Sequence, residues 1–356
     1  MKKTGLLKHW LSFLLIVCFC YTTTYGQQKK QTIVISGKEQ LVQQMYNEAV
    51  TKYEKGITAD IPKTMNEAIA MNKNFKELYF LLSKVQFENK QIEEAVKTLQ
   101  SCAQILQSKD SAYYLIALIY YQSQHNNNAL DYVNLAITEN SKDYKLYYLK
   151  GLIHTSKEAY AAAIEDYTKA IELNGALSEI YANRGLANYN SGDYPNAAKD
   201  YTEAIKIKAL PDYYNNKAIV EMAMNNHQEA IADCLKAIEL APTFYDAFNN
   251  KGIAHLSLGE FSEALKEFDT YINYNPTDYK GFNYRGVVYN YLGEYDKAVL
   301  DFDKSIELNP NEAEPYLNRG NTKEIMRNPE GACLDWKMAA KLGYKIAEKY
   351  MNINCK

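Results

Sequence analysis

The sequence has few residues of the kinds that build catalytic and metal centres. Among 356 residues there are five His, six Cys and two Trp. No pair of His residues has metal-ligand spacing together with acidic or Cys companions. No Gly-x-Ser-x-Gly motif and no Cys/His pair with a nucleophile signature is present. We therefore expect a protein that is not an enzyme and that binds no metal and no cofactor.

Long apolar runs are also missing. The run from Leu11 to Cys20 covers only about ten residues, too few to span a bilayer as a helix. It follows a start with three lysines and precedes small residues at Thr24 to Gly26, a pattern typical of a secretory signal peptide. We expect residues 1–26 to be removed and the protein to be exported, to the periplasm or cell envelope or as a secreted protein. The mature chain then has no transmembrane segment; the alternative is an uncleaved anchor.

An excess of positive charge is absent as well. The formal net charge is −3. Removal of residues 1–26, which contain three lysines and no acidic residue, lowers it to −6. An acidic balance argues against a protein that tracks phosphates, so we expect no nucleic-acid partner.

A pattern of fixed period fills the rest of the chain. A small residue recurs at steps of 34 residues, with one step of 33, at Ser83, Ala117, Gly151, Gly185, Ala218, Gly252, Gly286 and Gly320. An aromatic residue lies four positions before each, at Tyr79, Tyr113, Tyr147, Tyr181, Tyr214, Phe248, Phe282 and Tyr316. An alanine lies twelve positions after each, at Ala95, Ala129, Ala163, Ala197, Ala230, Ala264, Ala298 and Ala332. Such a period indicates one helical hairpin stacked on copies of itself, in which the small residue lets the paired helix approach closely.

These positions resemble the tetratricopeptide repeat consensus in residue type, order and spacing, over roughly residues 42–346. The resemblance implies an all-α fold: a right-handed α-solenoid of about nine helix hairpins with a C-terminal capping helix. We expect that helix over Tyr344 to Cys355, with residues 347–356 as its C-terminal part, and a spacer at residues 27–41. No long linker interrupts the array, so we expect one elongated domain.

The array departs from the consensus at identifiable places. The first hairpin is degenerate; its second helix is expected near Asp60, with Pro62 in the first turn, where Pro is tolerated. A one-residue deletion between Ala204 and Tyr214 shortens a loop between repeats. Polar residues occupy the consensus aromatic site of the first helix at His154, Asn188, Glu221 and His255.

Four cysteines remain once residues 1–26 are removed. Cys102 and Cys234 lie at inward positions of second helices, where we interpret them as small buried residues. Cys333 and Cys355 lie in the terminal unit, whose Ala-Cys-x-Asp-Trp ending resembles that of other exported bacterial repeat proteins. Because exported proteins tolerate disulfides, we hypothesise a Cys333–Cys355 disulfide that holds the closing helix.

Asparagine and tyrosine mark the face of the first helices that lines the concave groove in this family. Two positions before the small residue lie Asn183, Asn216, Asn250 and Asn318, with Tyr284 in the gap; one position earlier lie Asn215, Asn249 and Asn283. Tyr148, Tyr189 and Tyr291 fall on the same face. An amide offers both a donor and an acceptor, and Tyr combines contact area with a polar tip. The alternative is a solvated polar face of consensus asparagines.

These features predict a protein–protein interaction scaffold that binds a peptide or a partner protein in the concave groove. Assembly of a cell-envelope complex fits this picture by analogy. Some family members clamp a carboxylate with Lys and Arg from nearby repeats; here Lys145 and Lys280 are far apart, so a clamp is not supported. Two alternatives stay open: a self-assembling structural module, and a regulatory subunit of an enzyme.

Overall fold

The computed structural model describes residues 37–355, and within that range all regular elements are helices, α2 to α20. The predicted signal peptide and residues 27–36 of the predicted spacer lie outside the described residues. The described chain divides into two compact units, one ending at Leu106 and the other beginning at Gln107. A solenoid has no common core, because each hairpin packs on its neighbours, so a boundary can fall between two hairpins.

The first unit holds two hairpins. Its helices are α2 (Gly37–Glu54), α3 (Ile61–Met71), α4 (Lys76–Glu88) and α5 (Ile92–Ile105). Helix α2 begins within the predicted spacer because Lys, Glu and Gln, all good helix formers, follow Gly37, and Glu39 complements the dipole of the first turn. Helix α3 has Pro62 in its first turn, as the sequence predicts. Ile61, Met65, Leu78 and Val85 form the centre of the core of this unit.

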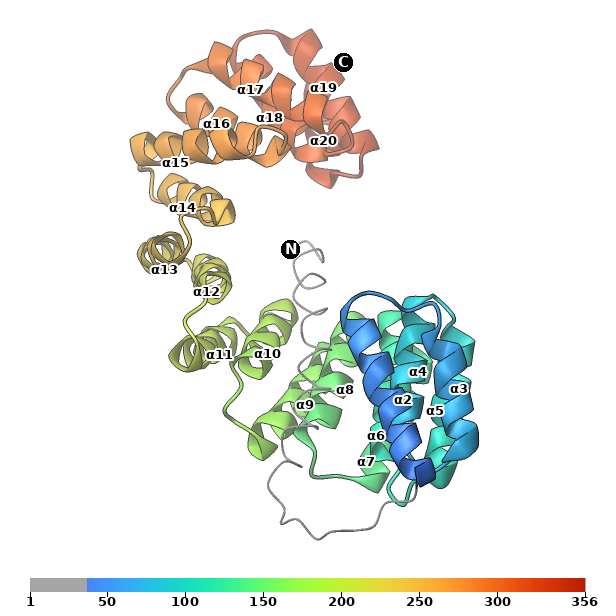
Figure 1. The fold of residues 1–356 in the computed structure, drawn as a ribbon. Coiled ribbons are helices and arrows are strands. Elements are labelled where there is room, and N and C mark those ends of the chain that lie inside the picture. Colours follow the sequence, from blue (N-terminus) through green and yellow to red (C-terminus); the bar gives the residue numbers. More distant parts are fainter. Residues whose placement is uncertain (1–36, 356) are drawn as a thin grey trace. The chain divides into compact units, whose positions relative to one another are not determined.

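The second unit continues the hairpins in chain order (Figure 1). Its helices are α6 (Asp110–Gln122), α7 (Asn126–Glu139), α8 (Tyr144–Ser156), α9 (Tyr160–Leu173), α10 (Ser178–Ser191), α11 (Tyr194–Ile207), α12 (Pro211–Ala223), α13 (His227–Leu240), α14 (Tyr245–Ser257), α15 (Phe261–Tyr274), α16 (Tyr279–Tyr291), α17 (Tyr295–Leu308), α18 (Ala313–Ile325), α19 (Pro329–Lys341) and α20 (Lys345–Asn354). The loop from α11 to α12, Lys208 to Leu210, is one residue shorter than the loop from α13 to α14, as the deletion predicts.

Close approach of the two helices in a hairpin explains the small residue of the repeat. A Cβ atom added to Gly252 would lie 2.7 Å from the ring of Phe268, and one added to Gly286 would lie 2.8 Å from the ring of Phe302. Both rings are fully buried. The two helices are joined by a turn that needs a left-handed residue, such as Gly259 with a φ of 76°.

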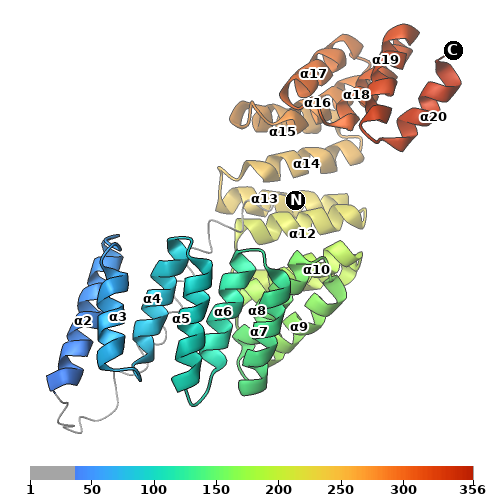
Figure 2. The ribbon, with the colours of Figure 1, turned by 90° about the vertical axis from the view of Figure 1, so that its right-hand side faces the viewer.

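The hairpins of the second unit follow one another along the stack (Figure 2). First helices contact one another in succession from α6 to α10 and from α12 to α18, and the hydroxyl of Ser178 on α10 lies 3.3 Å from the hydroxyl of Tyr213 on α12. We call the row of α8, α10, α12, α14, α16 and α18 the first-helix layer. Because the second helices pack behind it, the residues that face away from the second helices are the ones that a partner can reach on this layer.

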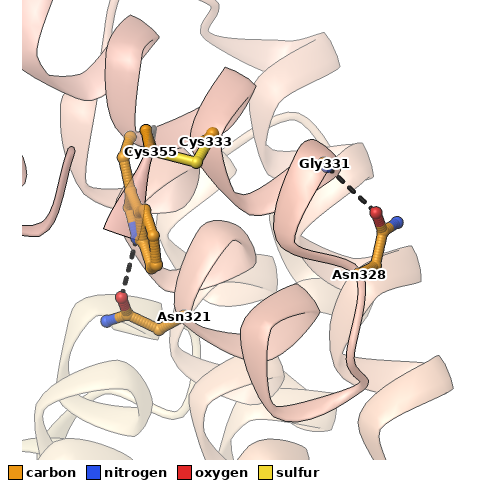
Figure 3. Close-up of a disulfide and its surroundings, with 6 residues drawn as sticks. Asn321, Asn328, Gly331, Cys333 and Cys355 are labelled. Atoms are coloured by element: carbon orange, nitrogen blue, oxygen red, sulfur yellow. Dashed lines mark hydrogen bonds between the residues drawn. A yellow bond between two sulfur atoms is a disulfide. The ribbon is translucent and has the colours of Figure 1, made fainter. Parts of the chain in front are cut away.

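The C-terminal end is closed by α20. Cys333 of α19 and Cys355, which follows α20, are joined by a disulfide with a Cα–Cα distance of 5.6 Å (Figure 3). Trp336 is buried and packs against Tyr350 of this helix, with ring centroids 5.6 Å apart, and its Nε1 donates to Asn321 Oδ1 at 2.9 Å. The amide of Asn328 caps the start of α19 by accepting from Gly331 N. The disulfide therefore ties the capping helix to the last hairpin.

Candidate functional site

The asparagines of the first-helix layer bond to one another across the boundary between repeats. Asn250 Nδ2 on α14 donates to Asn215 Oδ1 on α12 at 2.8 Å. Asn318 Nδ2 on α18 donates to Asn283 Oδ1 on α16 at 3.0 Å. The two residues of each pair are 35 positions apart. A residue of one repeat therefore contacts, in the preceding repeat, the residue that comes one position before its own equivalent. The predicted candidates at the two asparagine positions are thus brought together in pairs, which we call the amide ladder.

The ladder has a variant rung at its start. Asn183 Nδ2 on α10 donates to the hydroxyl of Tyr148 on α8 at 2.9 Å, again across 35 residues, and also to Glu179 O within its own helix. Burial raises the pKa of Tyr148 well above its usual range, so this hydroxyl stays neutral. Tyr148 therefore takes the place of an acceptor asparagine.

The ladder is interrupted at two steps, and the sequence explains both. Tyr284 stands at the donor position opposite Asn249, and the buried Oδ1 of Asn249 has no hydrogen-bond partner among the described residues. Asn216 stands at a donor position whose counterpart in the preceding repeat is Ala182, which has no side-chain acceptor. Asn216 is half-buried, and within residues 37–355 its amide forms no side-chain hydrogen bond. Asn216 therefore keeps its whole hydrogen-bonding capacity.

Two tyrosines of α16 form a pair of aromatic stacks with α15. The ring of Tyr284 lies over Phe268, with centroids 5.8 Å apart and an interplanar angle of 14°. The ring of Tyr291 lies over Phe261, with centroids 5.4 Å apart and an angle of 13°. Tyr291 follows Tyr284 by seven residues, and Phe268 follows Phe261 by seven residues. The two stacks therefore repeat along both helices. Tyr291 is 68% exposed, whereas Tyr284 is half-buried.

Tyr189 differs from these two. It is half-buried and packs beside Tyr194 of α11, with ring centroids 5.5 Å apart, against the core residues Ala197, Tyr201 and Val220. Its ring is therefore mainly a packing group of its own hairpin.

The largest polar feature of the second unit lies behind this layer, and the sequence analysis did not identify it. A basic residue directly precedes the small residue in six consecutive repeats and pairs with an acidic residue sixteen positions later. The pairs are Lys150–Asp166, Arg184–Asp200, Lys217–Asp233, Lys251–Glu267, Arg285–Asp301 and Arg319–Asp335. All six acidic residues are buried. The constant charge sign at two fixed positions of the repeat is the signal that would have revealed these pairs.

Three of the basic residues also reach back to the preceding repeat. Arg285 binds Asp301 through Nε at 2.8 Å and Nη2 at 2.7 Å, and its Nη1 binds Asp269 of α15 at 2.7 Å. Arg319 binds Asp335 and Asp303 in the same way, and Arg184 Nη1 donates to Thr168. The planar guanidinium suits such a two-sided contact. We call each set an arginine clamp, because it joins two repeats.

The buried acidic residues also explain two of the four polar side chains found at the consensus aromatic site. His154 Nδ1 lies 2.6 Å from Asp166, and Asn188 Nδ2 donates to Asp200 at 2.9 Å. Burial raises the pKa of Asp166, although the hydrogen bond from His154 opposes that shift. Burial raises the pKa of Asp233 too, against the opposing effect of Lys217. These residues serve the internal polar network and do not face a partner.

The described residues contain no reactive thiol, no metal-binding cluster and no membrane-spanning helix. Burial raises the pKa of the Cys102 and Cys234 thiols to about 12, so both are unreactive near neutral pH. Within residues 37–355 no group of three or more His, Cys, Asp or Glu side chains is placed to hold a metal ion. Over the same residues, every helix is too short or too polar to cross a bilayer.

Comparison with known proteins agrees with this architecture. Models of the tetratricopeptide repeat match residues 110–143, 178–209, 211–244, 234–266 and 279–312, and a TPR repeat model matches residues 151–192. No curated protein matches the chain.

Two solved structures illustrate the likeness of fold. The chain is similar to a tetratricopeptide repeat protein from Parabacteroides merdae ATCC 43184, with 19% identity, coverage of 69% of this chain and 99% of the other, and a TM-score of 0.60. It is also similar to the C-terminal part of a TPR repeat-containing protein from Cytophaga hutchinsonii, with 17% identity, coverage of 66% and 97%, and a TM-score of 0.55. From its six matched segments and its stacked helix hairpins, the chain belongs to the tetratricopeptide repeat family, whose arrays are scaffolds for protein interaction.

Proposed function

We propose that this protein is an exported, non-enzymatic scaffold that holds an extended peptide or a partner's segment against the first-helix layer of its second unit. The observation that carries the proposal is the pattern of used and unused hydrogen-bonding atoms in the amide ladder. In each rung the amide nitrogen of the donor asparagine is used, while the carbonyl oxygens of Asn183, Asn250 and Asn318 accept no hydrogen bond from residues 37–355. All three side chains are half-buried, so each offers a fixed acceptor to a ligand.

A row of fixed acceptors suits the backbone of an extended peptide, whose N–H groups are donors whatever its sequence. The bonds within each rung hold the amides in one orientation, so a ligand need not order them. Asn216 adds a complete amide between two rungs. Tyr284, supported by Phe268, adds a flat contact surface. Sequence selectivity would then come from the tyrosines and general adhesion from the amides.

Export is part of the proposal and is supported by the pattern of residues 1–26 and by the disulfide between Cys333 and Cys355. We place the protein in the periplasm or cell envelope, where a scaffold without chemistry of its own would assemble or stabilise a complex.

Site-directed photo-crosslinking in the native cells tests the proposal. A photoreactive residue is placed at Asn216, in the first-helix layer, and in a matched variant at Lys199, an exposed residue of α11 in the second-helix layer. A protein captured at Asn216 but not at Lys199 is the expected result. Binding of that protein to the Asn216→Ala and Tyr284→Ala double variant should then be weakened about tenfold or more, as for hot-spot residues.

Two other results would overturn it. Capture of the partner only at Lys199 would move the interaction to the second-helix layer. Capture only of further copies of this chain at Asn216 would favour the self-assembling module instead.

A further inference from the structure

We propose that the hairpin turns of the last three repeats form a second interaction surface, which binds an apolar segment flanked by basic residues. The surface comprises five exposed apolar side chains at the ends of α14, α16 and α18: Leu258, Tyr291, Leu292, Ile325 and Met326. We call it the turn patch. It does not depend on the amide ladder, so it goes beyond the proposed function.

Apolar side chains at these turn positions are not a constant feature of the repeat. Their exposed fractions are 38%, 68%, 42%, 53% and 40% in chain order. The equivalent positions carry Ser156 and Lys157 in one earlier repeat and Asn190 and Ser191 in the next. Because the same turn is polar there, the geometry of the hairpin does not require apolar residues at these sites. Exposed apolar residues that gather on one surface indicate an interaction site.

The turns lie next to each other. First helices α14, α16 and α18 contact in succession. Phe261, which starts α15 just after the first turn, stacks on Tyr291 at the second turn. Thirty residues separate Phe261 and Tyr291, and the same separation joins Lys157 Nζ to Asn127 Oδ1 at 2.7 Å in an earlier pair of repeats. The same separation predicts that Tyr295 lies next to Ile325 at the third turn, which extends the patch over all three turns.

The charges around the patch select the partner. The equivalent residues 258–263, 292–297 and 326–331 contain five acidic residues and two basic ones. The second helices that follow these turns carry Glu263, Asp296 and Glu330 in their first turns, whereas α7, α9 and α11 carry no acidic residue there. One of the two basic residues, Lys297, is already paired with Glu294. The patch therefore has an apolar centre and a negatively charged rim.

The negative charge of the rim argues against two other binding partners. A second copy that used the same patch would bring an equally acidic surface against it, and like charges facing each other oppose association. A bilayer with anionic lipids would be repelled for the same reason. A partner with apolar side chains between Lys or Arg residues meets both the centre and the rim.

Binding of a synthetic probe tests this inference. The probe is a fluorescent amphipathic Leu/Lys peptide, compared with the same peptide in which every Lys is Glu, and affinity is measured by fluorescence anisotropy. We expect the Leu/Lys peptide to bind, the Leu/Glu peptide to bind about tenfold more weakly or not at all, and binding of the first to weaken as salt rises.

Variants locate the site. Tyr291→Ser with Ile325→Asn gives the turns the residue types of the earlier repeats and should weaken binding about tenfold. The matched control is Leu300→Ser with Leu334→Ser, which removes two side chains that are 67% and 71% exposed on second helices. We expect that control to bind as the wild type does. All four side chains are exposed, and Tyr291 alone among them loses a ring stack, with Phe261. Both double variants should therefore unfold cooperatively, with only a small decrease in midpoint for the Tyr291→Ser, Ile325→Asn variant, which excludes misfolding.

Three outcomes would overturn the inference. Equal weakening by both double variants would show non-specific adsorption. Equal affinity of the two peptides would remove the role of the acidic rim. A concentration-dependent dimer in sedimentation that is lost only in the Tyr291→Ser, Ile325→Asn variant would identify the occupant as a second copy.

Discussion

The buried amide oxygen of Asn283 lies 3.0 Å from the amide nitrogen of Asn318, one repeat further along the chain. At the equivalent position of the preceding repeat, the amide oxygen of Asn249 is buried and has no partner among the described residues. The two asparagines therefore make a matched pair for measuring what one rung of the amide ladder contributes.

Replacement of Asn283 by Ala should lower the free energy of unfolding by about 1 kcal/mol, because it leaves the half-buried amide nitrogen of Asn318 without its acceptor. Replacement of Asn249 by Ala should cost far less, because it removes an oxygen that is already unsatisfied. Urea denaturation of both variants provides the comparison. Equal losses would show that the rung has no net effect.

The arginine clamp offers a second prediction. Arg285→Leu leaves the buried Asp301 without its cation, which should cost about 3 kcal/mol. The double variant with Asp301→Leu should recover much of that loss, since no buried charge remains. As the control, Lys304→Ala breaks the exposed pair with Glu307 and should cost less than about 0.5 kcal/mol. A double variant as unstable as the single one would contradict this explanation.

Replacement of Cys333 and Cys355 by Ser should destabilise the C-terminal end by ~3 kcal/mol in the chain-entropy model. In a repeat array each hairpin depends on its neighbours, so the effect should stay local. Hydrogen exchange should show faster exchange in α20 and α19 and unchanged exchange in α2 to α5. Loss of protection throughout the chain would instead indicate one cooperative unit.

The pH dependence of stability provides a fourth prediction. Burial raises the pKa of Asp233 above its ordinary value. The folded chain then holds this proton more tightly than the unfolded chain, so the contribution of Asp233 to stability falls as pH rises through the window above its ordinary pKa. Asp233→Asn removes that dependence, while Lys217 keeps Glu221 at 3.6 Å.

We therefore expect the stability of the wild type, relative to that of Asp233→Asn, to decrease with rising pH over the acidic range above the ordinary pKa of an Asp side chain. Urea denaturation of both proteins across this range measures the difference directly. A relative stability that increases with pH would mean that Lys217 outweighs the burial of the carboxylate.

The sequence predicts the hairpins well because their determinants are local. The spacing from Gly252 to Phe268 specifies a close contact within one hairpin, and the structure contains it. The deletion before Tyr214 likewise predicts the short loop between α11 and α12. The division into two units was not predicted, because a solenoid without a common core carries no residue pattern that marks where one compact unit ends.

The candidate site was predicted only in outline. The asparagines are where the repeat places them, but their mutual bonds depend on a 35-residue relation that differs by one from the period of the sequence. A comparison of equivalent positions at exactly one period therefore misses which amide meets which. The clamp residues were missed for a related reason. A charged residue taken alone is expected at the surface, and only its partner sixteen positions away shows that it belongs to a buried pair.

The clamp of Arg285 reaches Asp301 sixteen residues ahead and Asp269 sixteen residues behind, and Arg319 repeats this arrangement one period later. A repeat with an arginine at this position and aspartates at the two acidic positions presents the same connector at both of its ends. Such units are interchangeable at their junctions, so the gene can gain or lose whole repeats of this type without new compensating changes. The length of the first-helix layer is then free to vary independently of the way it is held together.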